Sequence, residues 1–278
     1  MTDIKKTIIV TGGTGRIGSA LTADLVKHGH QVLLGDINNS KLLKIKKKLN
    51  SKNLETFQGD LTTKNNIDRF IKFGVKKFEN IHAAVHCSYP TSKKFGARLE
   101  DLEEIYLKND LQNQLGGSII FSQRIMKYFL KQKKGNLILI SSIQGVQAPK
   151  FNHYKNLNMT SPIEYSAIKS GIISITKYLS KYYKNRNIRI NCVSPGGIKD
   201  NQPKLFTKRY RQSCNSKGLL DGEDISKLIL FLLSDKSKYI TGQNLIIDDG
   251  WSLWGKKFYF YFLTDLQNLF IINLKYLN

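Results

Sequence analysis

Apolar residues along the chain recur in short β-branched runs that alternate with longer segments of helical periodicity. The first run, Thr7–Val10, precedes a glycine-rich turn and the segment Ile17–His28, whose apolar residues have helical spacing. Further strands are predicted at Gln31–Gly35, Leu54–Gln58, Ile81–His86, Asn136–Ile140, Ile188–Val193 and Asn244–Ile247, and further helices at Ser40–Leu49, Asn65–Phe73, Leu111–Lys131, Pro162–Tyr183 and Ile225–Leu233. This alternation predicts an α/β domain with a doubly wound parallel sheet of about seven strands.

Two long stretches interrupt the alternation, residues 143–161 and 194–222. They follow the fifth and sixth predicted strands, and long loops at that edge of an α/β sheet are usually functional. We therefore expect them to form the rim of a binding site.

The last predicted strand completes the sheet near residue 251, which divides the chain into a domain over 1–251 and an apolar C-terminal extension over 252–278. Polar residues interrupt the extension too often for a membrane-spanning helix. We expect the extension to pack against a partner subunit or the substrate loop rather than against a membrane.

The net charge of +23 points to anionic partners, but the lysines are spread over nearly every segment. This distribution favours a solvated surface over a specific nucleic-acid site. The three cysteines, Cys87, Cys192 and Cys214, have no paired spacing that would predict a disulfide framework or a metal site. The N-terminus lacks the order of a secretory signal, so a cytoplasmic location is expected.

A glycine-rich turn joins the first predicted strand to the first predicted helix, and it predicts a Rossmann-like dinucleotide site. Its glycines permit a tight turn and a close approach of a pyrophosphate to the helix N-terminus, and Asp36 ends the second predicted strand at the expected separation. The expected cofactor residues of this half are Thr11, Gly12, Gly15, Arg16, Ile17, Gly18, Asp36, Asp60 and Leu61.

A carboxylate at Asp36 accepts hydrogen bonds from both ribose hydroxyls and repels a 2′-phosphate, so NAD is expected in preference to NADP. Asp36 has the alternative role of a helix N-cap, which Asn38 could also fill. Arg16 is either a solvated helix residue or a contact for a 2′-phosphate. Asp60 either contacts the adenine or caps the next helix.

Four further segments follow the predicted strands or lie on a predicted helix: Ser141-Ser142, Tyr165-Ser166-Ala167-Ile168-Lys169, Asn191 to Gly197, and Gly242-Gln243 through Asp249-Gly250. Together with the glycine-rich turn they resemble the short-chain dehydrogenase/reductase family over residues 5 to about 251. The resemblance implies that Tyr165 is the general acid/base, that Ser142 holds the substrate oxygen, and that Lys169 binds the nicotinamide ribose. It also implies cofactor contacts from Pro195, Gly196 and Ile198.

The spacing of the pair Tyr165 and Lys169 fits this chemistry. A lysine ammonium one helical turn from a tyrosine favours the phenolate, so we expect Lys169 to lower the pKa of Tyr165. Tyr154 lies nearer to Ser142 along the chain, but Asn158 occupies the position where the lysine would stand. We therefore place the acid/base at Tyr165 and treat the intervening segment as an insertion.

Three features depart from the family pattern. The glycine turn lacks a glycine at Arg16, the segment His86-Cys87-Ser88-Tyr89 replaces the usual Asn-Asn-Ala-Gly, and Gln114 stands where many relatives carry a proton-relay asparagine. Gln114 is retained as a candidate catalytic residue, with Asn113 adjacent.

A narrower resemblance accounts for these departures. Segments 88–96, 115–117, 158–165 and 197–203 resemble the flagellin-modification oxidoreductases linked to legionaminic-acid-type sugar biosynthesis. This resemblance implies a phosphorylated or nucleotide-linked sugar as substrate, in surface-glycan biosynthesis. The expected substrate contacts are Tyr89, Lys93, Ser142, Tyr154, Tyr165 and Lys199.

Two other functions remain open at the level of sequence. The first is a sugar epimerase or dehydratase that retains NAD on the same scaffold. The second is a non-catalytic module that binds NAD or nucleic acid. The family resemblance also implies a homodimer or homotetramer.

Overall fold

The computed structural model describes residues 5–253, in which seven parallel strands form one sheet in the order β3-β2-β1-β4-β5-β6-β7. The strands are β1 (Thr7–Thr11), β2 (Gln31–Asp36), β3 (Leu54–Gln58), β4 (Ala83–His86), β5 (Gly135–Ile140), β6 (Ile188–Pro195) and β7 (Asn244–Ile247). Strand order reverses direction between β1 and β4, which creates a crevice at the carboxyl ends of these strands. The predicted doubly wound sheet is confirmed.

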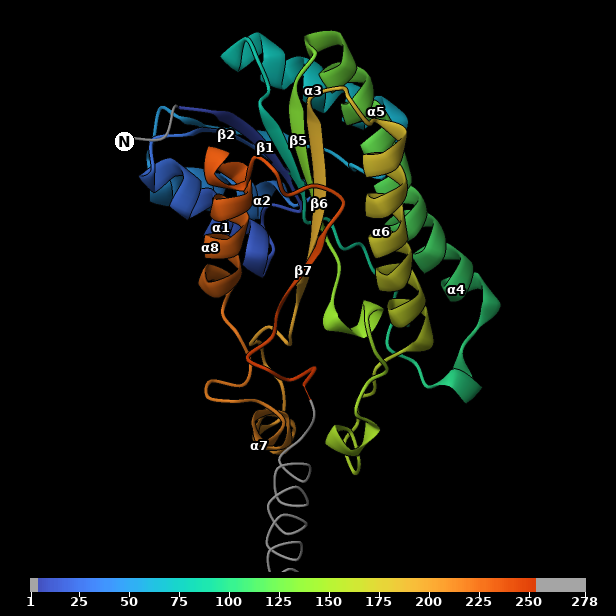
Figure 1. Cartoon of the computed structure of the whole chain (residues 1–278). Coiled ribbons are helices and arrows are strands. Elements are labelled where there is room, and N and C mark those ends of the chain that lie inside the picture. Colours follow the sequence, from blue (N-terminus) through green and yellow to red (C-terminus); the bar gives the residue numbers. More distant parts are fainter. Residues whose placement is uncertain (1–4, 254–278) are drawn as a thin grey trace, which may run out of the picture.

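Helices cover both faces of the sheet (Figure 1). One face packs against α1 (Arg16–Lys27), α2 (Asn39–Leu49) and α8 (Gly222–Leu233), and the other against α3 (Lys64–Phe78), α5 (Gly117–Gln132) and α6 (Ile163–Tyr182). The strands alternate their side chains between these two cores: Ile8 and Val10 join the first, and Ile9 joins the second. This burial on both faces explains why the strands read as continuous apolar runs.

The structure extends the predicted elements in two places. The helix expected at Leu111–Lys131 starts earlier, as α4 (Glu104–Asp110), and passes through a π-helical turn at Leu111–Gly116 before α5. The second long stretch, 194–222, contains a further helix, α7 (Lys204–Gln212), which is strongly basic and has few apolar residues. This helix was not predicted because only Phe206 and Tyr210 on it are buried, and two apolar positions among basic residues give a weak helical pattern.

The two long stretches after β5 and β6 meet beyond the carboxyl edge of the sheet, at the bottom of Figure 1. A third apolar cluster joins them: Ile143 from the first stretch, Phe206 and Tyr210 from α7, and Trp251 after β7 are all buried together. The predicted rim is therefore a packed structure with its own core.

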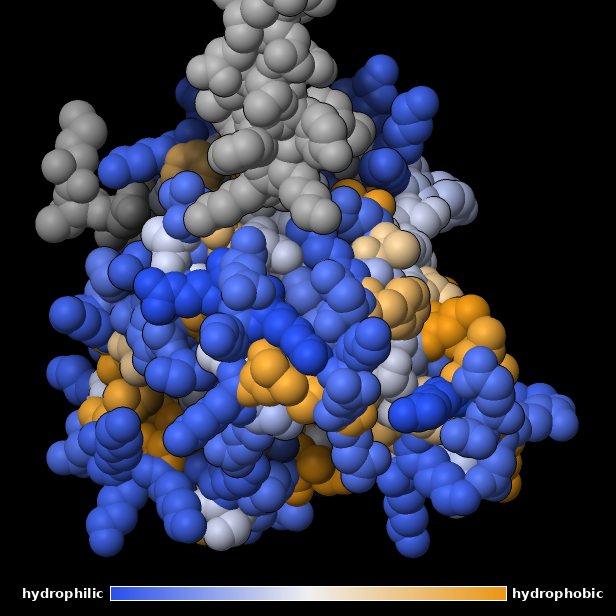
Figure 2. Space-filling view, turned by 90° about the horizontal axis from the view of Figure 1, so that it is seen from below, coloured by the Kyte–Doolittle hydropathy of each residue, from blue (hydrophilic) through white to orange (hydrophobic). Residues whose placement is uncertain are grey.

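Hydrophilic residues dominate the face seen from below, and apolar side chains gather there in separate patches (Figure 2). Within residues 5–253, no helix has the length and apolar character needed to cross a membrane. The extension expected over 252–278 lies outside the described residues from position 254 onward.

Candidate active site

The carboxyl ends of the strands border a cavity of about 700 Å³. Every expected cofactor residue lines it except Thr11, which is buried and hydrogen-bonds through its hydroxyl to His86 Nδ1 at 2.8 Å. Ser142, Tyr165 and Lys169 line the same cavity. The fold therefore brings the predicted dinucleotide site together with these three predicted catalytic residues, whereas the fourth, Gln114, does not line this cavity.

The glycine-rich turn is shaped by two close backbone approaches. Gly12 has a φ of +61°, and a Cβ atom there would stand 2.6 Å from the backbone of Cys87. A Cβ on Gly18 would stand 2.6 Å from the carbonyl oxygen of Gly12. Because no side chain caps α1 at Gly15, its first N–H groups remain available to a phosphate. These residues fit the pyrophosphate of a dinucleotide.

Asp36 stands at the end of β2 with its carboxylate at the cavity wall. It accepts hydrogen bonds from the backbone N–H groups of Thr14 at 3.0 Å and Asn38 at 2.9 Å. The helix cap of α2 is the side chain of Asn38, which accepts from Lys41 N at 2.9 Å. Asp36 is thus held against the glycine-rich turn and does not serve as the helix cap.

Asp60 has a local structural role in addition to its place at the cavity wall. Its Oδ1 accepts from the backbone N–H of Thr62 at 3.0 Å and from the hydroxyl of Thr62 at 2.7 Å. The residue that precedes α3 is Thr63, so Asp60 shapes the turn between β3 and α3 without being the cap itself. Both Asp60 and Leu61 line the cavity.

Arg16 forms an ion pair with Asp200 across the cavity. Asp200 belongs to the stretch after β6, where Gln202 accepts from Asp200 N at 2.6 Å and donates to Ile198 O at 2.8 Å. The sequence left two alternatives for Arg16, solvation and a contact with a 2′-phosphate, and the structure shows a third. Its guanidinium is directed to the stretch after β6.

Three of the four predicted catalytic side chains come from two adjoining elements. Tyr165 and Lys169 lie one turn apart on α6, and Ser142 follows β5. The hydroxyl of Ser141 donates to Lys169 O at 2.7 Å, which fixes the end of β5 against α6. The ammonium of Lys169 lies 5.5 Å from the ring centroid of Tyr165 and donates to Ile140 O at 3.1 Å.

Lys169 is not among the groups that shift the pKa of the Tyr165 hydroxyl. Burial raises the pKa of Tyr165 above its ordinary value, although a hydrogen bond with Ser142 acts in the opposite direction. Burial also lowers the pKa of Lys169 to about 8. Desolvation therefore sets the direction of the Tyr165 shift, which is opposite to the lowering expected from the spacing of Tyr165 and Lys169.

Tyr154 lines the same cavity from a different element. It comes from the stretch after β5, and its hydroxyl accepts from Gln144 Nε2 at 3.4 Å. Its ring packs 5.2 Å from that of Phe206 on α7. The structure therefore places Tyr165, and not Tyr154, beside Ser142 and Lys169.

Of the remaining predicted site residues, Tyr89 lines the cavity, and Lys93, Lys199 and Gln114 do not. The ring of Tyr89 lies 5.7 Å from that of Tyr165 and 4.9 Å from Lys169 Nζ. Gln114 is buried in the π-helical turn, and its side-chain amide has no hydrogen-bond partner among residues 5–253. Within the same residues no group of His, Cys, Asp or Glu is arranged to hold a metal ion.

Sequence reasoning missed Phe95, Gln144 and Asp200, which all line the cavity. The ring of Phe95 lies 6.3 Å from that of Tyr165 and completes an aromatic wall with Tyr89. Gln144 stands two residues after Ser142, and this proximity is the only sequence signal it offers. Phe95 and Asp200 lie in segments 88–96 and 197–203, which carry the narrower resemblance, but only long-range folding shows that these two side chains reach the site.

Together these side chains suit proton exchange at a substrate oxygen. Ser142 and Tyr165 offer two hydroxyls to the same oxygen, and Lys169 supplies a buried ammonium beside them. The glycine-rich turn and Asp36 adjoin them on the cofactor side.

Comparisons with known proteins agree with this geometry. The family model described as enoyl-(acyl carrier protein) reductase matches residues 14–252. The chain is 43% identical over 253 residues to post-translational flagellin modification protein A of Campylobacter coli, covering 89% of this chain and 98% of that protein. It is 29% identical over 253 residues to the 3-oxoacyl-[acyl-carrier-protein] reductase of Thermotoga maritima, covering 88% and 97%.

Among solved structures, the chain is similar to a short-chain dehydrogenase of Leptospira borgpetersenii with bound NAD⁺. The TM-score is 0.78 at 27% identity, and the match covers 90% of this chain and 93% of that one. The predicted resemblance is thereby confirmed, including its narrower part. The chain belongs to the short-chain dehydrogenase/reductase family and is an NAD(P)-dependent oxidoreductase of that type.

Proposed function

We propose that this enzyme transfers hydride between NAD and a hydroxyl or keto group of a phosphorylated or nucleotide-linked sugar used in surface-glycan synthesis. The observation that carries the proposal is the convergence of Ser142, Tyr165 and Lys169 with the glycine-rich turn in one cavity. Similarity to a flagellin modification protein at 43% identity supports the sugar substrate.

Two contacts support NAD as the cofactor. The carboxylate of Asp36 lies at the cavity wall, where a 2′-phosphate would meet a negative charge. Arg16, the cation nearest to the glycine turn in sequence, is engaged by Asp200 on the stretch after β6. An arginine held in that way does not offset the charge of Asp36.

Ser142, Tyr165 and Lys169 each have a separate role in the proposed reaction. Bound NAD supplies the hydride acceptor. In the oxidising direction Ser142 holds the substrate oxygen by a hydrogen bond, and Tyr165 accepts the hydroxyl proton. The ammonium of Lys169, which lies 5.5 Å from the ring centroid of Tyr165, would favour the phenolate form of Tyr165 that this transfer requires. In the reducing direction Tyr165 returns the proton.

The test is a screen of sugar phosphates and nucleotide sugars for a change in bulk NADH absorbance at 340 nm. We expect stoichiometric NADH formation with at least one sugar and a lower rate with NADP. Product formation without a net absorbance change would instead support an epimerase or dehydratase. Failure of every sugar, together with RNA binding that persists in saturating NAD, would support a non-catalytic module.

We also propose a cytoplasmic homo-oligomer. The outer faces of α5 and α6 expose the apolar side chains of Ile119, Tyr178 and Tyr182, with Tyr178 and Tyr182 stacked 5.8 Å apart. Exposed apolar side chains of this size on adjoining helices are typical of an interface. Light scattering coupled to gel filtration should give a mass of at least twice 31.7 kDa.

A further inference from the structure

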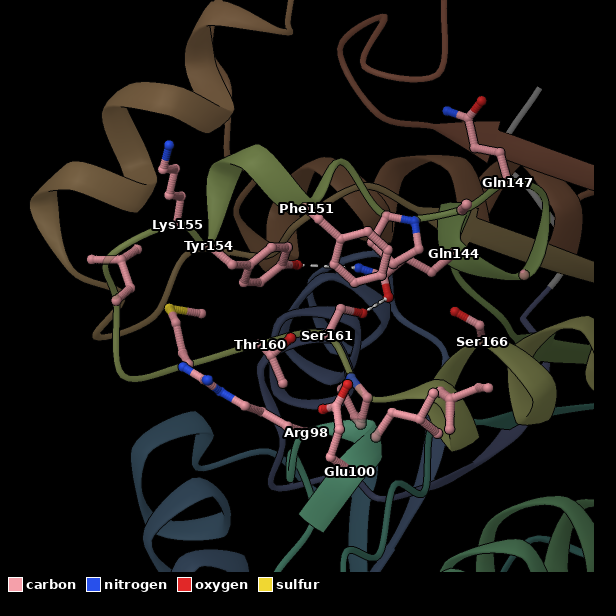
Figure 3. Close-up of a pocket in the computed structure, with 18 of the residues that line it drawn as sticks. Arg98, Glu100, Gln144, Gln147, Phe151, Tyr154, Lys155, Thr160, Ser161 and Ser166 are labelled. Carbon is pink, nitrogen blue, oxygen red and sulfur yellow. Dashed lines mark hydrogen bonds between the residues drawn. The ribbon is translucent and has the colours of Figure 1, made fainter. Parts of the chain in front are cut away.

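A second cavity of about 790 Å³ adjoins the active-site cavity. It lies between the stretch after β5, the start of α6 and the segment that contains Arg98 and Glu100 (Figure 3). Its volume falls in the range of about 300 to 1,000 Å³ that is typical of small-ligand sites. None of the expected cofactor residues lines it.

The two cavities share a wall. Gln144, Tyr154 and Ser161 line both, and they are joined by hydrogen bonds from Ser161 to Gln144 and from Gln144 to Tyr154 (Figure 3). Gln144 also donates its backbone N–H to the hydroxyl of Ser142 at 3.2 Å. A molecule that extends from Ser142 past this wall would therefore enter the second cavity.

The second cavity presents an aromatic ring on a fixed support. Phe151 is 61% exposed, although Lys150 before it and His153 two residues after it are both held by hydrogen bonds. Lys150 donates to Trp251 O at 2.8 Å, and the ring of His153 hydrogen-bonds to the hydroxyl of Ser213 at 2.9 Å. An exposed ring held by a rigid support suits stacking against a flat ligand such as a nucleobase.

Charged groups accompany this ring. Arg98 and Lys155 line the cavity, and neither side chain has a carboxylate partner within residues 5–253. The backbone of Lys155 is fixed by Arg209, whose guanidinium donates to Lys155 O. Glu100 also lines the cavity and has no ion pair in the described part of the chain. Cations suit a diphosphate, and a carboxylate suits ribose hydroxyls.

We propose that the second cavity binds the nucleoside diphosphate part of a nucleotide-linked sugar whose sugar ring reacts at Tyr165. This inference rests on the proposed function and narrows its substrate to one of the two classes. The phosphate of a sugar phosphate would contact only the cations Arg98 and Lys155, and it would give no role to Phe151 or Glu100. The exposed Phe151, the carboxylate of Glu100 and the size of the cavity all fit the larger nucleotide.

Binding to the full-length, NAD-saturated protein tests the inference without turnover. UDP, GDP, CDP and inorganic phosphate are titrated separately by calorimetry, and saturating NAD prevents binding of the nucleotides at the adenosine half of the cofactor site. We expect at least one nucleoside diphosphate to bind at least tenfold more tightly than inorganic phosphate. Phe151→Ala should weaken that binding about tenfold. Arg98→Gln should weaken it about fivefold and reduce its salt dependence.

Matched controls come from exposed residues that line neither cavity. Tyr239, which is 87% exposed, is changed to Ala, and the exposed Arg186 is changed to Gln. Both controls should bind the nucleotide as the wild type does, and all four variants should retain wild-type NAD affinity, which verifies their folding.

Three results would overturn the inference: no nucleotide binds to the NAD-saturated wild type, inorganic phosphate binds as tightly as the nucleotides, or Phe151→Ala and Arg98→Gln both bind like the controls. Different results would contradict the proposed function. Tyr165→Phe should still bind the nucleotide although it loses turnover, and nucleotide binding without NADH formation from any sugar would contradict the proposed hydride transfer alone.

Discussion

The cofactor half of the cavity and its rim are held together in different ways. In the cofactor half, short backbone hydrogen bonds fix the glycine-rich turn: Gly15 N donates to Gly12 O at 3.1 Å, and Gly13 N donates to Gly35 O at 3.2 Å. At the rim, side chains join positions far apart in sequence, as in the bond between His153 and Ser213, which are 60 residues apart. Backbone geometry therefore shapes the cofactor site, whereas side-chain packing shapes the substrate site.

The largest expected effect comes from the residue between these regions. Tyr165→Phe removes the ionisable oxygen but keeps the ring against Tyr89 and Phe95, so the fold and the NAD site should survive. We expect turnover to fall by about 10²- to 10⁴-fold with less than a threefold change in NAD affinity. Steady-state kinetics and NADH fluorescence titration measure the two quantities.

Tyr154→Phe is the matched control for that experiment. Its hydroxyl contacts Gln144 at the cavity wall, so its loss should raise KM and leave kcat within a few fold. Near-native turnover of Tyr165→Phe beside an inactive Tyr154→Phe would reverse the assignment of the acid/base.

A change confined to the cofactor half should have the next largest effect. Gly18→Val places a side chain where even a Cβ would stand 2.6 Å from Gly12 O, and the obstacle is backbone that has no room to move. We expect NAD affinity to fall about 100-fold and the free energy of unfolding to fall by about 1–3 kcal/mol. Fluorescence titration and urea denaturation measure these changes.

Gly29→Ala is a control for the mere loss of a glycine, because a Cβ at Gly29 meets nothing within 4 Å. Its positive φ of +79° should cost some stability without lowering NAD affinity. If Gly18→Val binds NAD as well as Gly29→Ala does, the close approach between Gly18 and Gly12 does not shape the cofactor site.

A change confined to the rim should show the opposite pattern. His153→Leu removes the hydrogen bond to Ser213 and should lower the free energy of unfolding by about 1 kcal/mol at pH 7, with NAD affinity within twofold of the wild type. Faster limited proteolysis within 143–161 or 194–222 should accompany the change. Loss of NAD affinity would show that the rim and the cofactor half are coupled.

The same variant should be less sensitive to acid. Burial lowers the pKa of His153 to about 4, so between about pH 6.5 and pH 4 the unfolded chain binds more protons at this residue than the folded one. The wild type therefore loses stability from this residue as the pH falls through that range. His153→Leu lacks this loss, so urea denaturation at pH 7, 6 and 5 should show the two proteins becoming nearly equal in stability at pH 6 and the variant the more stable at pH 5.

The smallest expected effect concerns the choice of cofactor. Asp36→Ser removes the charge that repels a 2′-phosphate but retains a short polar side chain beside Thr14. The ratio of NAD to NADP affinity should fall about threefold, chiefly through tighter NADP binding. A native protein that prefers NADP would contradict the role assigned to Asp36.

Much of the fold could be predicted because its signals are local. Each β-branched run became a strand, although β4 begins at Ala83 instead of Ile81. The glycine-rich turn and the pair Tyr165 and Lys169 also carry their spacing within one loop or one helix. The extent of the helical segment before α5 was missed because a π-helical turn at Leu111–Gly116 shifts its apolar face.

The sequence by itself determined the order of strands and helices, the position of the cofactor turn and the preference for Tyr165 over Tyr154. Only the tertiary structure decided that Arg16 pairs with Asp200, that Phe95 faces Tyr165, and that desolvation raises the pKa of the Tyr165 hydroxyl. Periodicity and short motifs express the geometry of neighbouring residues. Ion pairs, aromatic contacts and burial depend on which distant segments meet, and that is settled only when the sheet and its two cores assemble.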